Sequence, residues 1–449
     1  MKNLINSFRF IKKINLLDRL IFILISLIPL SLAVSIFFAD LVASFAGIIL
    51  LLIFFLNKEN DRKIIFLLKK EIILFSILYL IIILSFLWNN HKTFSFLPSI
   101  FYFRYFLLTL ALFYVFYKHD FLFKKFITLF LISFVIIIID SYFQLLFDYN
   151  LLGYKITTFE GTGKHITGFF NDEKKLGSYL IRNLPLLVCL ILLNSNKQNN
   201  LVEIVVILLI SVLIFYTSER TALSLLIIFC FIYFFVSKFK LIFVSIFILL
   251  ITSLLTLNDE FRYKYLDYTK MQSGLIFLEK NKKSTKQQEQ SKEWFKNEKI
   301  RFFSYEHENL AYTGLKIFEK NILLGTSVKS FHHACKNLRK KYGELTNDRQ
   351  NKLLCSTHPH NLFIQILAEI GIFGFIIISS VFFYFLYQII KLIFKKQLQN
   401  NQKAIVMSNL CIIINLMPFL PSGSFFNNWI SLILYFSIGI CLLINKKFQ

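Results

Sequence analysis

The sequence predicts an all-α polytopic membrane protein with about twelve transmembrane helices and one large loop outside the cytoplasm, between spans nine and ten. Three observations support this fold class. The 449 residues are 56% hydrophobic and include 55 Phe, with a mean hydropathy of +0.62, which exceeds the apolar content of ordinary soluble domains. Apolar runs of about 20 residues, long enough to cross a bilayer, recur along the chain. Basic residues gather in alternate loops between these runs.

Each expected span is an apolar run that ends at charged residues or at a turn. The runs 201–217 and 222–237 are separated only by Ser218–Thr221, and the charges of Glu219 and Arg220 there favour a hairpin between two spans over one overlong span. We expect the spans at about 19–38, 41–57, 71–88, 97–117, 126–147, 176–194, 201–217, 222–237, 241–257, 359–389, 402–420 and 425–444.

The distribution of Lys and Arg orients the spans. Loops that follow even-numbered spans are basic, as are both chain ends, whereas the opposite short loops carry little beyond Lys92 and Arg220. Under the positive-inside rule both ends lie in the cytoplasm, so the topology is N-in and C-in. A basic stretch precedes the first span, but no Ala-x-Ala cleavage pattern follows it, so we expect a retained span rather than a signal peptide.

This topology divides the chain into transmembrane helices one to nine (1–257), a periplasmic loop domain (258–358) and transmembrane helices ten to twelve (359–449). The first half of the loop is poor in apolar residues and is expected to be solvated. Residues 308–318 have apolar side chains at helical spacing, so the second half is expected to pack over a site. The net charge of +24 follows largely from the basic inner loops, and no basic and aromatic module indicates nucleic-acid binding.

A polar stripe enters the tenth span. Asn361, Gln365 and Glu369 recur every four residues in an otherwise apolar run, and two imidazoles, His358 and His360, flank a proline just before it. Polar side chains at membrane depth cost about 2.5–3.5 kcal/mol on insertion scales, so such a stripe usually faces a wet cavity or a site. We therefore predict an active site at this junction between loop and helix.

The helical pattern does not decide which imidazole matters. A helix that ran back through Pro359 would bring His358 into the stripe and turn His360 away, but residues before a helical proline are rarely helical themselves. Both imidazoles could also merely cap the helix and supply polar groups at an interface with water. Their combination with three polar side chains at one helix entrance favours the functional interpretation.

Two of the six cysteines fall outside the spans. Cys335 and Cys355 lie in the large loop, and an oxidising periplasm favours a disulfide between them that closes the segment before His358. No Cys and His spacing suits zinc, and we expect neither a metal nor another cofactor. The other cysteines lie in spans, where buried Cys usually acts as a small hydrophobe: Cys189, Cys230, Cys411 and Cys441.

Several basic residues on the outward face are candidates for binding an anion. Arg220 at the hairpin tip either reaches for the membrane interface or clamps an anion. A glycine-rich segment could bring Lys164 and His165 to a phosphate, although glycine loops are common. Arg301 and His307 flank the helical part of the large loop.

These motifs resemble the O-antigen ligase and polymerase superfamily of lipid-linked glycan transferases, over roughly residues 100–445. The most specific element is the run from His358 to Gly374, in which His360 directly precedes Asn361. The layout of about twelve spans with a large outward loop between the ninth and tenth is also similar. Further matching segments are Ser218–Arg220, Gly168–Glu173 and Asn321–Gly325.

The resemblance implies a reaction and its residues. A His at this junction is taken in the family as the base that activates an acceptor sugar hydroxyl, which would be His360 here, with His358 and the polar stripe in support. Family arginines hold the diphosphate of an undecaprenyl-linked donor. Arg220 matches the hairpin arginine, whereas His307 occupies the place of the second, with Arg301 a turn or two earlier.

The resemblance also implies partners and a location. The donor would be an undecaprenyl-diphosphate-linked glycan and the acceptor a lipid A-core or another glycan, among membrane lipids and without a metal. The protein would lie in the bacterial inner membrane with its active site facing the periplasm. We therefore expect an O-antigen ligase-like glycosyltransferase.

Three alternatives stay open. An O-antigen polymerase would extend lipid-linked repeats with the same donor chemistry, and a protein O-oligosaccharyltransferase would use a protein acceptor; the sequence separates both poorly from a ligase. A polysaccharide transporter or flippase is the rival from another class. Transporters typically have two related halves with sites at the midplane. Here the large loop makes the halves unequal and the candidate groups share one face, which favours an enzyme.

Overall fold

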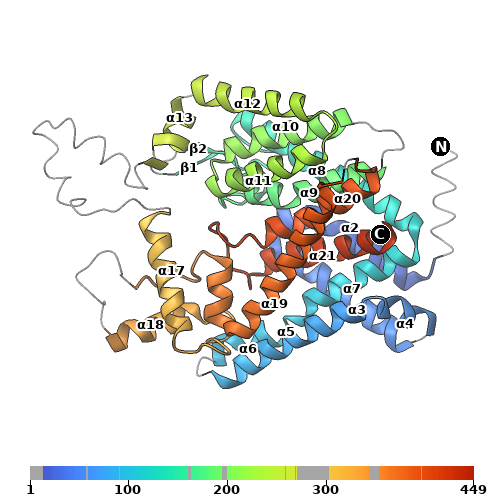
Figure 1. The fold of residues 1–449 in the computed structure, drawn as a ribbon, viewed down its shortest axis with the longest axis vertical. Helices are drawn as coiled ribbons and strands as arrows, with labels where there is room; N and C mark the ends of the chain where they lie inside the picture. The colour runs from blue at the N-terminus through green and yellow to red at the C-terminus, as the bar shows by residue number, and fades with distance from the viewer. Residues whose placement is uncertain are drawn as a thin grey trace, which may run out of the picture.

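The protein, seen in a computed structural model, is almost entirely helical (Figure 1). The structure describes residues 14–56, 59–89, 92–159, 163–194, 200–257, 259–267, 269–270, 303–342, 353–395 and 397–448. One short antiparallel hairpin departs from the predicted all-α class: β1 (Thr157–Phe159) pairs with β2 (Gly163–His165).

The helices of the described residues follow in chain order. Their bounds are α2 (Leu16–Val34), α3 (Ile36–Leu56), α4 (Glu59–Phe66), α5 (Lys69–Trp88), α6 (Lys92–Ile100), α7 (Phe103–Lys118), α8 (Asp120–Phe147), η1 (Gly168–Phe170), α9 (Leu176–Asn194), α10 (Asn200–Thr217), α11 (Arg220–Val236), α12 (Lys240–Leu257), α13 (Asp259–Arg262), η2 (Tyr263–Asp267), α17 (Tyr305–Phe318), α18 (Phe331–Tyr342), α19 (Leu362–Ile393), α20 (Asn400–Asn415) and α21 (Asn428–Phe448).

Eight helices within the described ranges are long and apolar enough to cross a membrane, and three further apolar helices, α10, α11 and α12, are shorter. The chain is therefore a multi-pass membrane protein. The span expected at 402–420 is wrong at its end, because α20 stops at Asn415. A proline, Pro418, follows and cannot continue the helix hydrogen bonding. The count of twelve spans and their N-in, C-in orientation stay predictions.

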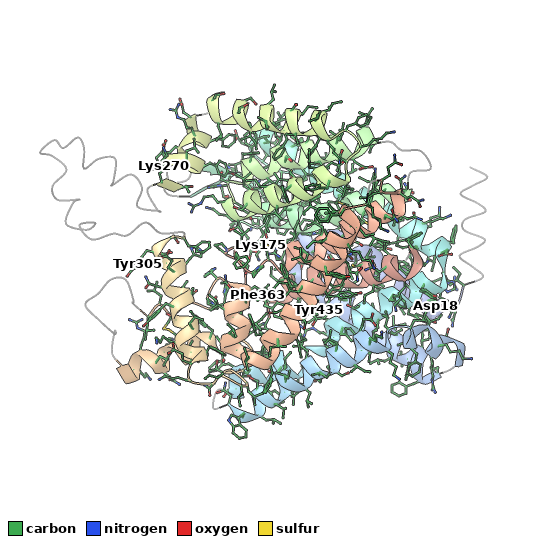
Figure 2. The ribbon with its side chains drawn as sticks, viewed as in Figure 1. Asp18, Lys175, Lys270, Tyr305, Phe363 and Tyr435 are labelled. Atoms are coloured by element: carbon green, nitrogen blue, oxygen red, sulfur yellow. A yellow bond between two sulfur atoms is a disulfide. The ribbon has the colours of Figure 1, made fainter. Side chains whose placement is uncertain are left out.

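The centre of the bundle is formed by α9 and α21, since 89% of the apolar stretch of each is buried, compared with 28% for α5. The helices α7 and α21 approach closely at Gly439, where an added Cβ atom would lie 3.3 Å from the carbonyl oxygen of Thr109. Small residues allow such approaches between membrane helices. Tyr435 of α21 lies in this interior (Figure 2) and stacks on Tyr105 of α7. Outer helices such as α5 are left with apolar surface for lipid.

The helix that carries the polar stripe, α19, is broken at Gly371, which has φ 67° and ψ −167°. The break frees carbonyl groups of the preceding turn, and the oxygen of Ala368 accepts the backbone N–H of Thr326 at 2.9 Å. A Cβ atom on Gly325 would collide with the backbone of the same turn. Irregular backbone within a span is tolerated where protein covers it. Backbone hydrogen bonds thus join two of the matching sequence segments, Asn321–Gly325 and the end of the His358–Gly374 run.

The large loop folds onto the start of α19. Its helices α17 and α18 enclose a small apolar cluster that includes Leu310, Phe331 and Leu353. A disulfide joins Cys335 of α18 to Cys355, with Cα atoms 5.5 Å apart. The segment that carries the two candidate imidazoles is therefore held between this disulfide and the first residue of α19.

Candidate active site

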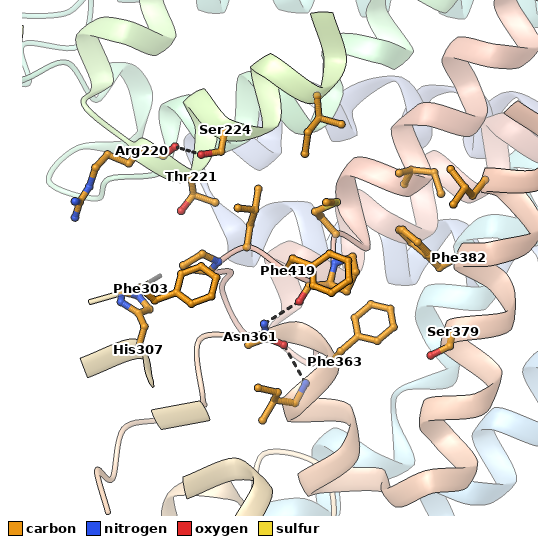
Figure 3. A pocket seen from close by; sticks show the side chains of 18 of the residues that line it. Arg220, Thr221, Ser224, Phe303, His307, Asn361, Phe363, Ser379, Phe382 and Phe419 are labelled. Carbon is orange, nitrogen blue, oxygen red and sulfur yellow. Dashed lines mark hydrogen bonds between the residues drawn. The ribbon is translucent and has the colours of Figure 1, made fainter. Parts of the chain in front are cut away.

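A groove of about 1260 Å³ lies between α11, α17, α19 and the loop that joins α20 to α21 (Figure 3). Its mouth is at the first residues of α11 and α19 and is polar, with Arg220, Ser304, His307 and Asn361. The remainder follows α11, α19 and α20 and is mostly apolar, with the hydroxyls of Ser224 and Ser379 as exceptions; its apolar lining is Ile228, Ile232, Phe375, Phe382, Leu386, Ile389, Leu410 and Ile413. The groove thus leads from a basic and hydrogen-bonding mouth into an apolar channel.

Arg220 is the first residue of α11, and Figure 3 shows its guanidinium on the same side of the groove as His307. The turn before it is tight, because Ser218 has a left-handed backbone with φ 55°. The Nη1 atom of Arg220 donates to the hydroxyl of Thr269 at 3.5 Å. A guanidinium can hold two phosphate oxygens at once and does not lose its proton, so this position suits an anionic ligand.

Three imidazoles meet beside the mouth. The ring centres of His358 and His360 are 4.1 Å apart, and those of His360 and His307 are 5.5 Å apart. The structure therefore places His307 next to the pair that precedes α19, a relationship that the sequence did not predict. His360 has a left-handed backbone with φ 53°, which turns the chain just before the helix.

Hydrogen bonds distinguish the two imidazoles before α19. The Nε2 atom of His358 lies 3.2 Å from the carbonyl oxygen of Ser422, and its Nδ1 atom lies 2.9 Å from the hydroxyl of Thr357. Because a carbonyl can only accept, Nε2 of His358 carries the proton and Nδ1 accepts from the hydroxyl. The ring nitrogens of His360 form no hydrogen bond within the described part of the chain. His360 is therefore the imidazole that can take up a proton.

All three imidazoles are held in the neutral form near pH 7. Burial lowers the pKa of His358 to about 4, and the neighbouring His360 adds to that shift. Burial, then His307, lowers the pKa of His360 below the ordinary imidazole value. Burial lowers the pKa of His307 in the same way; Arg220 lowers it further, while Glu306 opposes the shift. A neutral imidazole with an unoccupied nitrogen can act as a general base.

The polar stripe orients the start of α19. Asn361 is the N-cap, with its side-chain oxygen accepting from the N–H of Ile364 at 3.1 Å and its amide donating to the carbonyl of Pro418 at 2.8 Å. Gln365 and Glu369 are buried, and the Gln365 amide donates to the Glu369 carboxylate at 3.0 Å. Of the three, only Asn361 lines the groove. Gln365 and Glu369 hold the helix in place rather than reaching the groove.

The loop between α20 and α21 contributes to the site, which sequence reasoning missed. The N–H of Ser422 donates to the carbonyl of His360 at 2.9 Å, and the N–H of Phe425 donates to the side-chain oxygen of Gln365 at 2.9 Å. Pro418 and Phe419 of the same loop line the groove. Two prolines, a glycine and two serines at 418–424 were the available signal, because such clusters mark ordered turns rather than spans.

Of three further predicted anion-binding residues, the structure describes the side chain of one, His165, which does not line the groove. His165 is buried, with its Nδ1 atom 3.0 Å from the carbonyl oxygen of Thr217, so it supports the hairpin before Arg220. Lys164 lies in β2 with its backbone opposite Thr158, and its side chain is outside the described part. Arg301 lies outside the described residues. In those residues no group of three or more His, Cys, Asp and Glu side chains is placed to hold a metal ion.

Fold and site together define a multi-pass membrane protein with a histidine-bearing polar mouth on an apolar groove. The family model described as O-antigen ligase matches residues 204–379. This segment, which includes Arg220, His307, His360 and the polar stripe, is similar to the O-antigen ligase family, in agreement with the resemblance found in the sequence. No curated protein matches the chain.

Proposed function

We propose that the protein is an O-antigen ligase-like glycosyltransferase that moves a glycan from an undecaprenyl-diphosphate carrier to a hydroxyl of a lipid A-core or related acceptor. The site would face the periplasm of a bacterial inner membrane. One observation carries the proposal: Arg220 and His307 stand at the mouth of a groove whose remaining walls are mostly apolar side chains. A lipid-linked diphosphate has the same division into an anionic head and an apolar tail.

Donor binding follows from this division. Arg220 would hold the diphosphate with two N–H groups. His307 would donate a hydrogen bond to the diphosphate from its Nε2 atom. Its other ring nitrogen, Nδ1, lies 2.5 Å from the hydroxyl of Ser304, the N-cap residue of its helix. If that hydroxyl donates, the proton of the neutral ring is on Nε2, the other nitrogen. The prenyl chain would then lie along the apolar walls between α11, α19 and α20.

The transfer step requires one proton acceptor and stabilisation of one leaving group. The acceptor hydroxyl loses its proton to His360 while its oxygen forms the new bond to the anomeric carbon. The bond from that carbon to the diphosphate oxygen breaks, and its electron pair stays with the undecaprenyl diphosphate. Arg220 offsets the charge that grows there, and this scheme requires no metal.

The acceptor decides between the ligase and its nearest alternative. The experiment uses the purified protein in detergent with undecaprenyl-diphosphate-linked glycan and, in separate reactions, lipid A-core or the lipid-linked glycan alone. Transfer to lipid A-core supports the ligase, and longer lipid-linked chains without it support a polymerase. Glycan transfer to neither, together with movement of lipid-linked glycan across vesicles, would indicate a transporter.

A further inference from the structure

The residue before Arg220 makes an unusual contact. Glu219 occupies the N-cap position of α11 but forms no side-chain hydrogen bond to that helix. Its carboxylate instead reaches the start of α9, where Oε1 accepts the N–H of Gly177 at 2.8 Å and Oε2 accepts the N–H of Ser178 at 2.9 Å. The first N–H groups of a helix have no partner within it, and its N-terminus favours negative charge. One carboxylate therefore caps α9 from the start of α11.

Close packing fixes the distance between these two helix ends. An added Cβ atom on Gly177 would lie 3.1 Å from Oε1 of Glu219 and would collide with the hydroxyl of Thr217. The turn itself is restricted as well, because Ser218 has a left-handed backbone. The hairpin that presents Arg220 thus rests directly on the first turn of α9.

A buried cation lies behind the same carboxylate. Arg182, one turn further along α9, is 4% exposed. Its Nε atom donates to the hydroxyl of Ser178 at 3.1 Å, and its Nη1 atom donates to the side chain of Asn415, the last residue of α20, at 3.2 Å. Burial raises the pKa of Glu219 to about 7, and the two N–H groups and Arg182 oppose that shift. These contacts join the ends of α9, α11 and α20 around Glu219.

We propose that Glu219 is a positioning residue for donor binding, which holds Arg220 at the mouth of the groove by fixing the first turn of α11 to α9. The inference rests on the proposed role of Arg220 as the diphosphate clamp. Glu219 itself does not line the groove among the described residues, so its effect must pass through Arg220. Loss of the carboxylate would allow the hairpin to shift and would weaken the donor complex without removing the proton acceptor.

The test compares the wild type with Glu219→Gln, Arg220→Lys and the double variant in steady-state transfer from undecaprenyl-diphosphate-linked glycan. A Gln side chain keeps the shape but turns an NH2 group toward one of the two N–H donors. We expect the donor KM to rise about tenfold, because the substitution removes roughly one charge-assisted hydrogen bond. The change in kcat should be much smaller. In the Arg220→Lys background the same substitution should add little, because residues that act through one another are not additive.

The matched control is Glu203→Gln. Glu203 is another buried acid, in the first turn of α10 at the opposite end of the same hairpin, where it accepts from the hydroxyl of Tyr233 at 3.1 Å. We expect its removal to lower the thermal stability without changing the donor KM. If Glu219→Gln does not accumulate in the membrane, Gly177→Ala perturbs the same contact from α9 and should also raise the donor KM.

The outcomes separate this inference from the function on which it rests. If Arg220→Lys leaves the donor KM unchanged, the proposed clamp is wrong. If Arg220→Lys raises the donor KM but Glu219→Gln and Gly177→Ala do not, only the positioning role fails. Equal effects of Glu219→Gln and Glu203→Gln on KM would likewise overturn it, because a general loss of packing would then explain both.

Discussion

The imidazole rings of His358 and His360 lie 4.1 Å apart, yet they differ in what holds them. The ring of His358 is fixed at both nitrogens, by Ser422 and Thr357. Among the described residues the ring nitrogens of His360 form no hydrogen bond, while its backbone carbonyl accepts from the N–H of Ser422. This difference supports the proposal that His360 is the base and that His358 has a supporting position.

The first prediction follows from that difference. His360→Ala should reduce glycan transfer by about 10²–10⁴-fold, the usual contribution of a general base, while the protein still accumulates in the membrane. His358→Ala should be milder, because it removes a neighbour of the base. Transfer is measured with purified protein and undecaprenyl-diphosphate-linked glycan. Full activity of His360→Ala would end the assignment, and the reverse order of the two effects would move the base to His358.

The second prediction concerns pH. Burial and His307 hold the pKa of His360 below 6.5, so the base stays neutral through the neutral range and is lost only when the pH falls through that lowered value. We expect kcat/KM to be level near pH 7 and to fall on the acidic side of 6.5. His307→Asn removes a neighbouring imidazole that contributes to the shift, so its acidic limb should move to higher pH. A limb at an unchanged pH in this variant would contradict the coupling.

Local sequence patterns predicted the helices better than their interruptions. Hydropathy and length are properties of each segment, so the apolar runs indicated helices such as α9 and α21. The break at Gly371 has a distant cause, because its backbone partners lie in the segment before α18. The early end of α20 at Asn415 is similar, since Asn415 bonds to Arg182 of α9. Periodicity alone carries no information about such partners.

The candidate site was predictable as a helix face but not as a set of contacts. The four-residue spacing places Asn361, Gln365 and Glu369 on one side of α19. The partners of Asn361 and Gln365 come from the loop before α21, some 60 residues further along the chain, whereas Glu369 accepts the backbone N–H of Phe331 in α18. No local pattern predicts these contacts. His307 was expected at the diphosphate because of its place in the loop. Its position beside His360 depends on how α17 packs on α19 and appears only in the structure.

The third prediction concerns the disulfide between Cys335 and Cys355, which are 20 residues apart in the sequence. In the chain-entropy model a loop of this size contributes roughly 3 kcal/mol. The bridge also anchors the segment that carries the imidazoles, so its reduction should lower both the unfolding temperature and the rate of transfer. Thiol labelling of denatured, unreduced protein is the measurement. Labelling of both residues without prior reduction would show that the bridge is absent in the cell.

The fourth prediction is that Arg220 binds the donor diphosphate, so that Arg220→Lys gives weak donor binding and strongly reduced transfer. Lysine keeps the charge but loses the planar fork that can hold two phosphate oxygens. Arg220 lines the mouth of the groove beside His307, and its Nη1 atom donates to the hydroxyl of Thr269 at 3.5 Å, a long hydrogen bond that a phosphate oxygen can replace. A side chain that merely reached for the membrane interface would tolerate lysine.

The decisive comparison is transfer by wild-type and Arg220→Lys protein from purified undecaprenyl-diphosphate-linked glycan, with and without a chelator. We expect the wild type to be insensitive to the chelator, because Arg220 and His307 together supply the groups that the diphosphate needs. Loss of wild-type turnover with the chelator would instead mean that a metal ion holds the diphosphate. Turnover of Arg220→Lys at the wild-type rate would contradict the proposed role of Arg220 in binding the diphosphate. Another cation would then be needed at the mouth of the groove, and Arg301 would be the next residue to substitute.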